Sequence, residues 1–242
     1  MCGRFTLTRK SFRELATELD AFYDEEFTEL YRPRFNVAPT DPHWIVRTKQ
    51  ERRELLPAKW GLVNSWSKSA KGAFKQINAR SESALTRPAF REAFEKRRCV
   101  VPADGFFEWK GAKEARRPIW FHAPDAGLLL FAGLYETWHD PLVGDRQRTF
   151  TILTTSANNV VAPVHDRMPV ILPAERVDDW LHIPTRNAVV YANDLRTLLA
   201  PADERTLVAT EVSRRVNSVA NDDEACLAPA NDAEYAEAPR LL

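Results

Sequence analysis

The sequence predicts an α+β fold, a single domain with a largely antiparallel, barrel-like β core and a few flanking helices. Two observations indicate this class: apolar or alternating runs of strand length recur along the chain, and helical patterns are few and scattered. The length of the chain adds a further indication, because 242 residues without an internal repeat or a long Gly/Ser linker fit one large domain. The expected strands, separated by Pro, Gly, Asn and Asp, are 43–48, 55–63, 98–109, 117–122, 128–135, 149–155, 168–172 and 206–213.

Four helices are expected, and the first has the clearest signal. Ser11 and Glu14 have the spacing of a capping box, and helical periodicity in the apolar residues that follow predicts a helix over 11–22. A second helix is expected to begin at Pro88, because proline is favoured in a first helical turn, and to reach Lys96. The remaining two are expected over 173–181 and 192–200.

The charge of the chain is balanced overall but uneven along its length. The 34 basic and 34 acidic side chains give a net charge of zero, which excludes polycation-style coating of long nucleic acids. Residues 59–117, however, hold 14 basic and 6 acidic side chains, and residues 121–242 hold 10 and 18. A local excess of +8 is a field that can orient a polyanion, so a nucleic-acid partner remains open.

The cysteines and apolar runs exclude several other classes. Cys2, Cys99 and Cys226 cannot all pair, and their spacing has no zinc-binding pattern, so a disulfide scaffold and a structural metal are not expected. The longest apolar runs, such as 127–134, are too short to cross a bilayer, and no secretory signal is visible. We expect a cytoplasmic protein, and an arginine-rich, lysine-poor second half favours a bacterial source.

Cys2 is the residue with the most distinctive chemistry. Removal of Met1 would give Cys2 a free α-amine beside its thiol, with reference pKa values of about 7.7–8.0 and about 8.5. We therefore expect both groups to be partly reactive near neutral pH. The pair has two uses: the thiolate can attack an acyl carbon with the amine as base, or the amine can condense with an aldehyde and the thiolate then close a thiazolidine ring.

Two short motifs and one aromatic strand supply further candidates. Asn78 and Arg80 are two residues apart, as are His165 and Arg167, so each pair shares one face of an extended segment. Arginine suits phosphate and histidine titrates near neutrality. Glu108 follows two phenylalanines, and a carboxyl buried there would have a raised pKa that suits a general acid or base.

Each candidate also has an ordinary structural explanation. Asn78 would cap a helix at 81–85, and Arg80 and Arg167 would form surface ion pairs. Glu108 would point to solvent from an edge strand, and His165 would be a satisfied loop histidine. Trp66 lies among lysines, a composition typical of a single-stranded nucleic-acid groove, in which bases stack and phosphates pair.

Together these residues resemble one family, the SOS response-associated peptidase (SRAP) family of abasic site processing proteins. The resemblance spans residues 2 to about 222, so we expect one domain over 1–242 with a C-terminal extension from about 223. Asn64 departs from the pattern, since members often have proline there. The matching motifs are MCGRF (1–5), RFNVAP (34–39), WGLV (60–63), INARSE (77–82), CVVPADGFFEW (99–109), FAGL (131–134) and HDRMPV (165–170), then VS at 212–213 and VN at 216–217.

The resemblance implies that Cys2 forms a thiazolidine crosslink with the ring-opened aldehyde of an abasic site in single-stranded DNA, shielding the lesion during DNA repair. It also implies some abasic-site lyase activity and self-cleavage after Met1, without a metal or organic cofactor. The catalytic residues would be Cys2, Asn78, Glu108 and His165, with Glu108 and His165 handling the protons. The DNA contacts would be Arg4, Asn36, Trp66, Arg80, Thr154 and Arg167.

Two alternative functions remain at this point. Class II glutamine amidotransferases also begin Met-Cys-Gly, so an N-terminal-cysteine amidohydrolase or peptidase is possible, although Arg4-Phe5 departs from that start. The other alternative is a non-covalent single-stranded DNA-binding module, in which the basic segment accounts for all of the DNA binding. In each case we expect a monomer that does not bind membranes.

Overall fold

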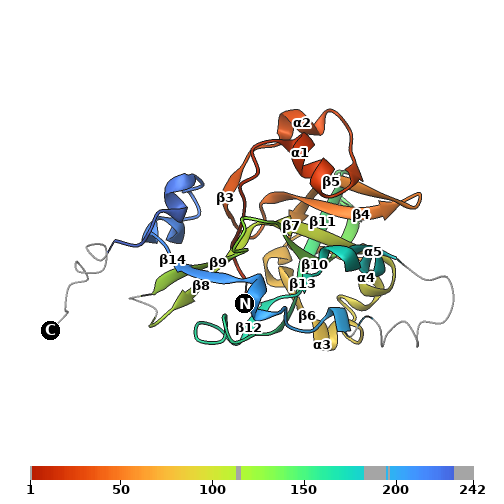
Figure 1. Cartoon of the computed structure of the whole chain (residues 1–242). Helices are drawn as coiled ribbons and strands as arrows, with labels where there is room; N and C mark the ends of the chain where they lie inside the picture. Colours follow the sequence, from red (N-terminus) through yellow and green to blue (C-terminus); the bar gives the residue numbers. More distant parts are fainter. Residues whose placement is uncertain (1, 113–115, 183–194, 196, 232–242) are drawn as a thin grey trace.

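The chain folds around a closed five-stranded β-barrel. The computed structural model describes residues 2–112, 116–182, 195 and 197–231 (Figure 1). Neighbouring strands pair antiparallel in the order β11-β10-β7-β4-β5, and β5 then pairs with β11 in parallel and closes the ring. This confirms the expected class and the barrel-like core. The barrel strands are β4 (Pro42–Lys49), β5 (Arg52–Trp60), β7 (Arg98–Ala103), β10 (Leu129–His139) and β11 (Arg146–Ser156).

A second sheet lies against one end of the barrel and is antiparallel throughout (Figure 1). Its strand order is β14-β9-β8-β1-β3, so the N-terminal strand is an inner strand of the sheet. The bounds are β1 (Phe5–Leu7), β3 (Arg34–Val37), β8 (Gly105–Lys110), β9 (Arg117–His122) and β14 (Val208–Glu211).

Short elements complete the fold. Four small strands extend the barrel sheet: β2 (Ala21–Phe22), β6 (Asn78–Arg80), β12 (Arg167–Pro169) and β13 (Ile171–Leu172). The α-helices are α1 (Phe12–Glu18), α2 (Phe27–Leu30), α3 (Ser81–Ala84), α4 (Arg91–Lys96) and α5 (Val177–Leu181). The 3-10 helices are η1 (Ala73–Gln76), η3 (Ala174–Arg176), η4 (Glu204–Thr206), η5 (Arg214–Asn217) and η6 (Glu224–Leu227). None of the described helices has both the length and the apolar character needed to cross a membrane.

Two apolar clusters follow from the alternation of side chains along the barrel strands. On β4, His43 and Ile45 face the inner cluster, whereas Trp44 and Val46 face an outer cluster. The outer cluster packs against α1, α4 and α5. Phe5 of β1 belongs to the inner cluster, so the N-terminal strand contributes directly to the core that it borders.

The expected helices are found with shorter bounds. Ser11 caps α1 and accepts a hydrogen bond from the backbone N–H of Glu14 at 3.3 Å, but the helix ends at Glu18 because the chain turns through a left-handed Asp20. The helices expected over 88–96 and 173–181 correspond to α4 and to η3 with α5. Of the one expected over 192–200, residues 195 and 197–200 are described, and residues 195, 197 and 198 are helical.

The run expected as one strand over 98–109 is two strands, β7 and β8, separated at Asp104. Its carboxylate accepts hydrogen bonds from the Thr6 hydroxyl at 2.5 Å and from the backbone and hydroxyl of Thr8 at 2.5 and 2.7 Å. The nearly buried Asp104 therefore fixes the point at which the chain passes from the barrel to the second sheet and holds β1 beside it.

Residues 213–229, which we call the C-terminal strap, pack across β3 and β8. Asp222 accepts hydrogen bonds from the backbone N–H groups of Phe35 at 2.7 Å and Asn36 at 2.9 Å, and it pairs with Arg34. Asn36 in turn donates its amide hydrogens to strap carbonyls, those of Val216, Ser218 and Asn221.

The end of the strap is also built into the domain. Cys226 is buried against Phe107, Val212 and Val216, and Val212 forms a β-bridge with Pro229. We propose that the domain includes the whole strap, so that a C-terminal extension begins after residue 229.

Replacing Asp222 tests the role of the strap. Asp222→Ala leaves two backbone N–H groups without their acceptor and removes one of the two carboxylates that pair with Arg34, so we expect the free energy of unfolding to fall by about 2–4 kcal/mol. The measurement is urea unfolding. Glu25→Ala, which removes a carboxylate paired with the exposed Arg13, should leave the unfolding midpoint nearly unchanged. Equal effects of the two substitutions would contradict this role.

Candidate functional site

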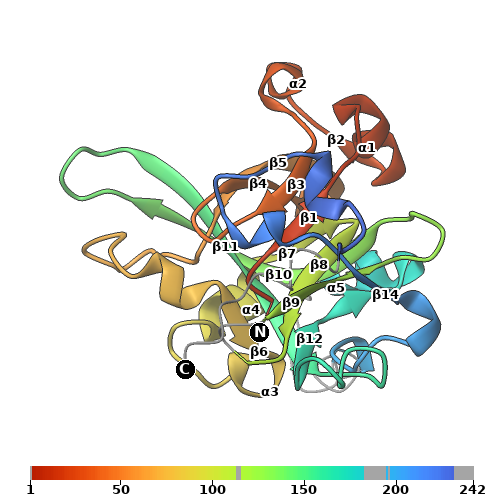
Figure 2. The ribbon, with the colours of Figure 1, turned by 90° about the vertical axis from the view of Figure 1, so that its left-hand side faces the viewer.

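The N-terminal segment places Cys2 in the interior. Residues 2–4 continue β1 alongside β8, with the backbone N–H of Phe107 donating to the Arg4 carbonyl at 3.0 Å. The Cys2 side chain is fully buried, and its thiol lies 3.7 Å from the Arg4 carbonyl. In Figures 1 and 2 this end of the chain lies beside β6 and β12, which bring the other candidate residues.

Asn78 fixes the main chain of Cys2. The strand β6 pairs in parallel with β11, with Asn78 opposite Ile152, and this pairing aims the side chain at the N-terminal segment. The Asn78 Nδ2 donates to the Cys2 carbonyl at 2.6 Å. Its Oδ1 is buried and has no hydrogen-bond partner among the described residues. Asn78 therefore has one more polar contact to offer beside Cys2. It does not cap the helix that follows, because the N-cap position of α3 is Arg80, whose side chain makes no capping hydrogen bond.

Glu108 is buried, as the aromatic residues around it predicted. It lies on β8 opposite Ile119 and has 5% of its surface exposed. Burial raises the pKa of the Glu108 carboxyl, and the nearby His165 partly opposes this shift. Glu108 thus does not point to solvent from an edge strand, and it is suited to exchanging a proton.

The expected reactivity of the Cys2 thiol needs correction. Burial raises the pKa of Cys2 strongly, and the negative charge of Glu108 adds to the shift, so the thiol is protonated in this geometry. The sequence-based expectation of a partly ionised thiol near neutral pH used the pKa of a solvated cysteine. A reaction at Cys2 therefore needs a neighbouring group that takes the thiol proton as the sulfur bonds.

His165 and Arg167 are presented by one tight loop. The backbone N–H of His165 donates to the Val161 carbonyl at 3.0 Å, and the Asn158 Oδ1 accepts from the N–H of Val161 at 3.1 Å. The His165 Nδ1 accepts from the backbone N–H of Arg167 at 2.9 Å. The same Nδ1 lies 3.0 Å from a carboxylate oxygen of Asp166, so the proton of a neutral ring is on Nε2 when the Arg167 contact is kept and on Nδ1 when Asp166 accepts it.

Arg167 is held from two sides. Its guanidinium binds both carboxylate oxygens of Glu82, with Nη2 to Oε2 at 2.9 Å, and donates to the Thr154 carbonyl at 2.5 Å. Its Nε has no hydrogen-bond partner among the described residues. Arg167 does form an ion pair, as one interpretation of the sequence allowed, but one buried N–H of the guanidinium remains available. Arg80 lies on the same rim, exposed, and its charge also acts on Glu82.

Arg4, Asn36 and Thr154 take structural positions in this geometry. The Arg4 Nη1 donates to the Asn36 Oδ1 and to the Val216 carbonyl, each at 2.9 Å. Asn36 and Thr154 are fully buried. These three side chains brace the strap, β3 and Arg167, and so act on the site through their neighbours.

Trp66 stands at the surface of a basic loop. Its side chain is 67% exposed, and the loop it occupies, residues 61–76, leads directly into β6. The indole of Trp138 donates to the Ser67 carbonyl at 2.7 Å, and the Asn64 Nδ2 donates to the Ala89 carbonyl at 2.7 Å. Both contacts anchor the loop, so Asn64 substitutes a hydrogen bond for the rigidity that proline would give.

Glu82 is the residue that the sequence argument missed. Its place in the INARSE motif, two residues after Arg80, was a usable signal, because a carboxylate close in sequence to a predicted phosphate-binding arginine is a candidate ion-pair partner. What could not be read from the sequence is that Glu82 binds Arg167, 85 positions later.

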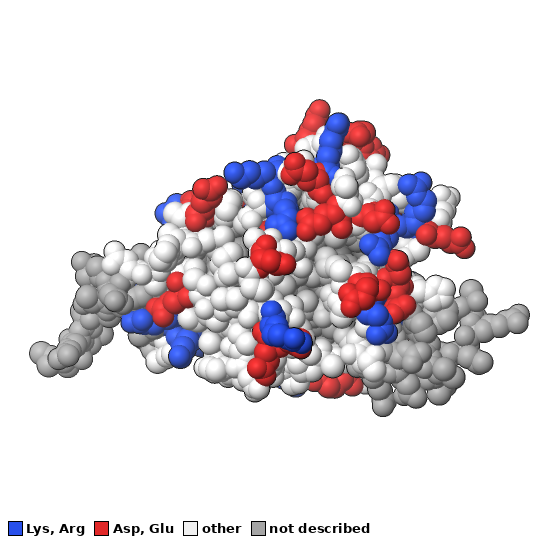
Figure 3. Space-filling model, viewed as in Figure 1, with Lys and Arg blue, Asp and Glu red and all other residues white. Residues whose placement is uncertain are grey.

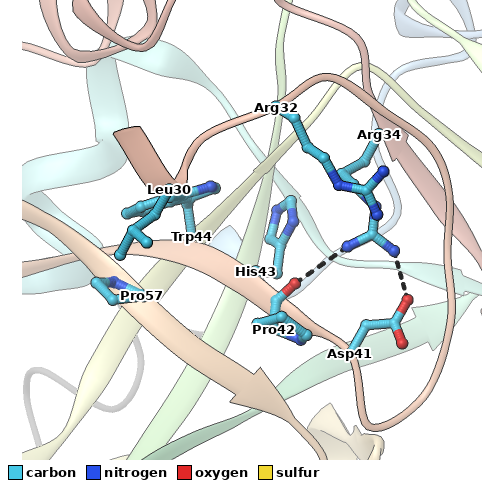
Figure 4. A pocket seen from close by; sticks show the side chains of 8 residues that line it. All are labelled: Leu30, Arg32, Arg34, Asp41, Pro42, His43, Trp44 and Pro57. Atoms are coloured by element: carbon cyan, nitrogen blue, oxygen red, sulfur yellow. Dashed lines mark hydrogen bonds and ion pairs between the residues drawn. The ribbon is translucent and has the colours of Figure 1, made fainter. Parts of the chain in front are cut away.

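Other surface features do not belong to this cluster. A hollow of 380 Å³ beside β3 and β4 is lined by Arg34, Asp41 and His43 with their neighbours, and none of the predicted site residues lines it (Figure 4). Burial lowers the pKa of His43 to about 3, so this ring is neutral. Within the described residues no group of three or more His, Cys, Asp or Glu could hold a metal ion. Basic and acidic side chains alternate over the face in Figure 3.

Comparisons with known proteins bear on this cluster. A family model described as "SOS response associated peptidase (SRAP)" matches residues 1–219. The chain is 37% identical over 225 residues to the abasic site processing protein YoqW of Bacillus subtilis, covering 92% of this chain and 96% of that protein. It is 32% identical over 233 residues to the abasic site processing protein HMCES of Gallus gallus, covering 82% and 67%.

Solved structures with the same fold include two bacterial proteins. A protein from Bacteroides thetaiotaomicron superposes with a TM-score of 0.83 at 25% identity, covering 95% of this chain and all of that one. A protein from Bordetella bronchiseptica superposes with a TM-score of 0.72 at 26% identity, covering 88% and 100%.

The raised pKa of Glu108 predicts a pH-dependent stability. Because the folded protein holds the Glu108 proton to a higher pH than the unfolded chain, wild-type stability falls as pH rises from the ordinary glutamate pKa through the raised one. Glu108→Gln removes this equilibrium, so it should gain stability relative to wild type at about pH 8 compared with about pH 4.5. Urea unfolding at the two pH values measures it. Glu95→Gln on the exposed face of α4 is the control. If the free energies of unfolding of wild type and Glu108→Gln differ by the same amount at both pH values, the assignment is refuted.

Proposed function

The chain belongs to the SOS response-associated peptidase family, and from this premise we propose that it captures abasic sites in single-stranded DNA. The relatives' names as abasic site processing proteins support DNA with abasic sites as the substrate class. The proposed link is a thiazolidine formed by Cys2 after removal of Met1. The observation that carries the proposal is the placement of Cys2: its carbonyl is held by Asn78 and its thiol lies in the field of Glu108.

The proposed reaction balances without a cofactor. The Cys2 amine attacks C1′ of the ring-opened aldehyde, and loss of water gives an imine. The thiol sulfur then adds to the same carbon, and the thiol proton ends on the ring nitrogen. One C–N bond and one C–S bond replace the C=O bond, and one water leaves. The charge of Glu108 acts on the thiol, and its carboxylate passes the thiol proton to the ring nitrogen, since the buried sulfur cannot release that proton to solvent.

His165 is assigned the step before capture. An abasic deoxyribose is mostly a closed ring, so its ring oxygen must gain a proton before the aldehyde appears. Nε2–H is the proposed donor, either in the tautomer whose Nδ1 accepts from the Arg167 backbone N–H or in a protonated ring whose Nδ1 pairs with Asp166. The electrostatic coupling of His165 with Glu108 connects the ring-opening and crosslinking steps.

We assign binding of the DNA strand around the lesion to two arginines and one aromatic ring. Arg167 and Arg80 bind the phosphates on the rim of the site, and Trp66 stacks on a base. Asn78 contributes its unpartnered Oδ1 to the sugar. Arg4, Asn36 and Thr154 support these groups from below. Binding through one or two phosphates fits a neutral protein better than coating of a long strand.

The same imine has a second fate. Proton loss at C2′ followed by β-elimination would cut the strand, so abasic-site lyase activity is the side reaction that ring closure by the thiol suppresses. Self-cleavage after Met1 would use the same site and would expose the amine that the crosslink needs. An N-terminal-cysteine hydrolase of another substrate and a purely non-covalent DNA-binding module are the competing functions.

Removal of the nucleophile tests the proposal. Processed protein, with Met1 loss verified by intact mass, is mixed with a single-stranded oligonucleotide carrying one abasic site. Wild type should give a heat-stable, gel-shifted adduct, and Cys2→Ala should give none. Cys226→Ala is the matched control, since Cys226 is also a buried free cysteine but lies in the strap. No adduct from processed wild type would refute the proposal, and equal binding by Cys2→Ala to damaged and undamaged DNA would favour the non-covalent module.

The proton roles are separated by substrate and pH. His165→Ala should slow crosslinking to an abasic site by about 10²- to 10⁴-fold but leave crosslinking to an acyclic aldehyde in an oligonucleotide nearly unchanged. Glu108→Gln should slow both. Because an ionised Glu108 is the base, the wild-type rate should rise with pH through a pKa above the ordinary glutamate range, and Glu108→Gln should lose that rise. Unchanged rates in both variants would contradict these roles while leaving the Cys2 assignment intact.

A further inference from the structure

A pocket of 450 Å³ opens beside Arg167, and none of the predicted site residues lines it. Its walls come from α3, α4, the end of β11 and the residues Leu195, Leu199 and Ala200. On β11, Ser156 pairs with Arg167 in the sheet register, and the preceding Thr155 also lines the pocket. The pocket therefore continues the proposed site along one strand.

The pocket has an apolar side and a polar side. Its accessible apolar surface comes from Leu85 and Ala200, with the almost fully buried Phe94, Leu195 and Leu199 beside them. Ser81, Thr155 and Glu82 supply the polar side. A nucleobase combines these two features, since its faces stack on apolar side chains and its edge forms hydrogen bonds.

Glu82 joins the pocket to the phosphate-binding group. Both of its oxygens contact Arg167, and this hydrogen bond is the main cause that lowers the pKa of the Glu82 carboxyl. An ionised carboxylate offers about four lone-pair positions, and the two Arg167 contacts, together with the Glu82 backbone N–H, do not use all of them. The remaining acceptor positions favour a base edge that donates protons.

We propose that this pocket holds the base of a nucleotide next to the abasic site, and that Glu82 selects bases with an exocyclic amino group over thymine. Adenine, cytosine and guanine each present an amino donor, whereas the single N–H of thymine lies between two carbonyl oxygens that the carboxylate repels. The pocket end of β11 is four residues from Ile152, which is opposite Asn78, or on the order of 13 Å along the strand. That separation suits a neighbouring nucleotide and not the abasic sugar itself. The inference rests on the proposed function, because it needs the lesion at Cys2.

The test varies one base at a time. Single-stranded oligonucleotides carry one abasic site, with adenine, cytosine, guanine, thymine or no base at the adjacent 5′ or 3′ position, and the rate of adduct formation is measured at subsaturating protein. At one of the two positions, loss of the base should slow capture by about 5- to 150-fold, the range that stacking of one base supplies. At that same position thymine should react several-fold more slowly than the three amino-bearing bases.

Two variants separate selection from general effects. Glu82→Gln, which carries an N–H donor as well as an acceptor, should bring thymine level with the other bases. Any uniform change from freeing Arg167 cancels in this ratio of rates. Ser156→Trp at the pocket mouth should remove the dependence on that base altogether. Glu92→Gln, at an exposed α4 carboxylate paired with Lys96, is the control and should preserve the wild-type ratios.

The outcomes distinguish the two proposals. Adduct formation with equal rates for every base at both positions would overturn the pocket assignment and leave the Cys2 crosslink standing. Equal dependence on the base on both sides would also overturn it, because stacking elsewhere along the strand would then explain the effect. Absence of any adduct from processed wild type would overturn both proposals.

Discussion

The pairing of residues 2–7 with β8 is the constraint on which the rest of the site depends. The first residues of a chain are normally the least ordered, yet here the hydrogen bonds from Phe107 to Arg4 and from Asp104 to Thr6 fix them as an inner strand. Phe5 then lies in the inner apolar cluster, edge-on to Trp60 at 4.9 Å between ring centroids. Burial of this one ring secures the strand, so Cys2 is fixed three residues away without contacts of its own at the surface. The strap strengthens the same arrangement, because Arg4 binds both Asn36 and Val216.

Burial of the chain end sets the electrostatics of the cluster. Cys2 and Glu108 both lose solvent, and the negative charge of Glu108 adds to the raised pKa of the thiol, so the sulfur keeps its proton. On the proposed mechanism such a site stores its nucleophile in an unreactive form. Reaction becomes favourable when an electrophile arrives and the proton moves within the cluster, so bulk ionisation is not needed. His165 extends the network toward solvent at its outer edge, where protons can be exchanged.

The sequence predicted the parts of this protein whose signals are local. The capping box at Ser11, the extended Asn78–Arg80 segment and the buried carboxyl at Glu108 each follow from neighbouring residues, and the structure agrees with all three. The sequence did not predict the strands β1 and β3, because three or four residues are too few to show the alternating pattern of a strand. Ring closure by β5 on β11, the strap and the Glu82–Arg167 pair depend on contacts between distant segments. The reactivity of Cys2 was misjudged for the same reason, since its pKa is set by tertiary burial.

On the proposed mechanism, the ion pair of Arg167 helps a neutral protein to select damaged DNA. In the free protein Glu82 already balances the guanidinium, so a phosphate gains only the difference between two anionic partners and one unused Nε–H. An undamaged strand then has little to gain, because counterion release is small when the cations are few and already paired. On the proposed mechanism only a strand with an aldehyde forms covalent bonds with Cys2. Those bonds hold the damaged strand on the protein, whereas electrostatic attraction alone does not. A more basic groove would hold undamaged strands as well and would slow the search for the lesion, so the balanced charge of the chain is part of its specificity.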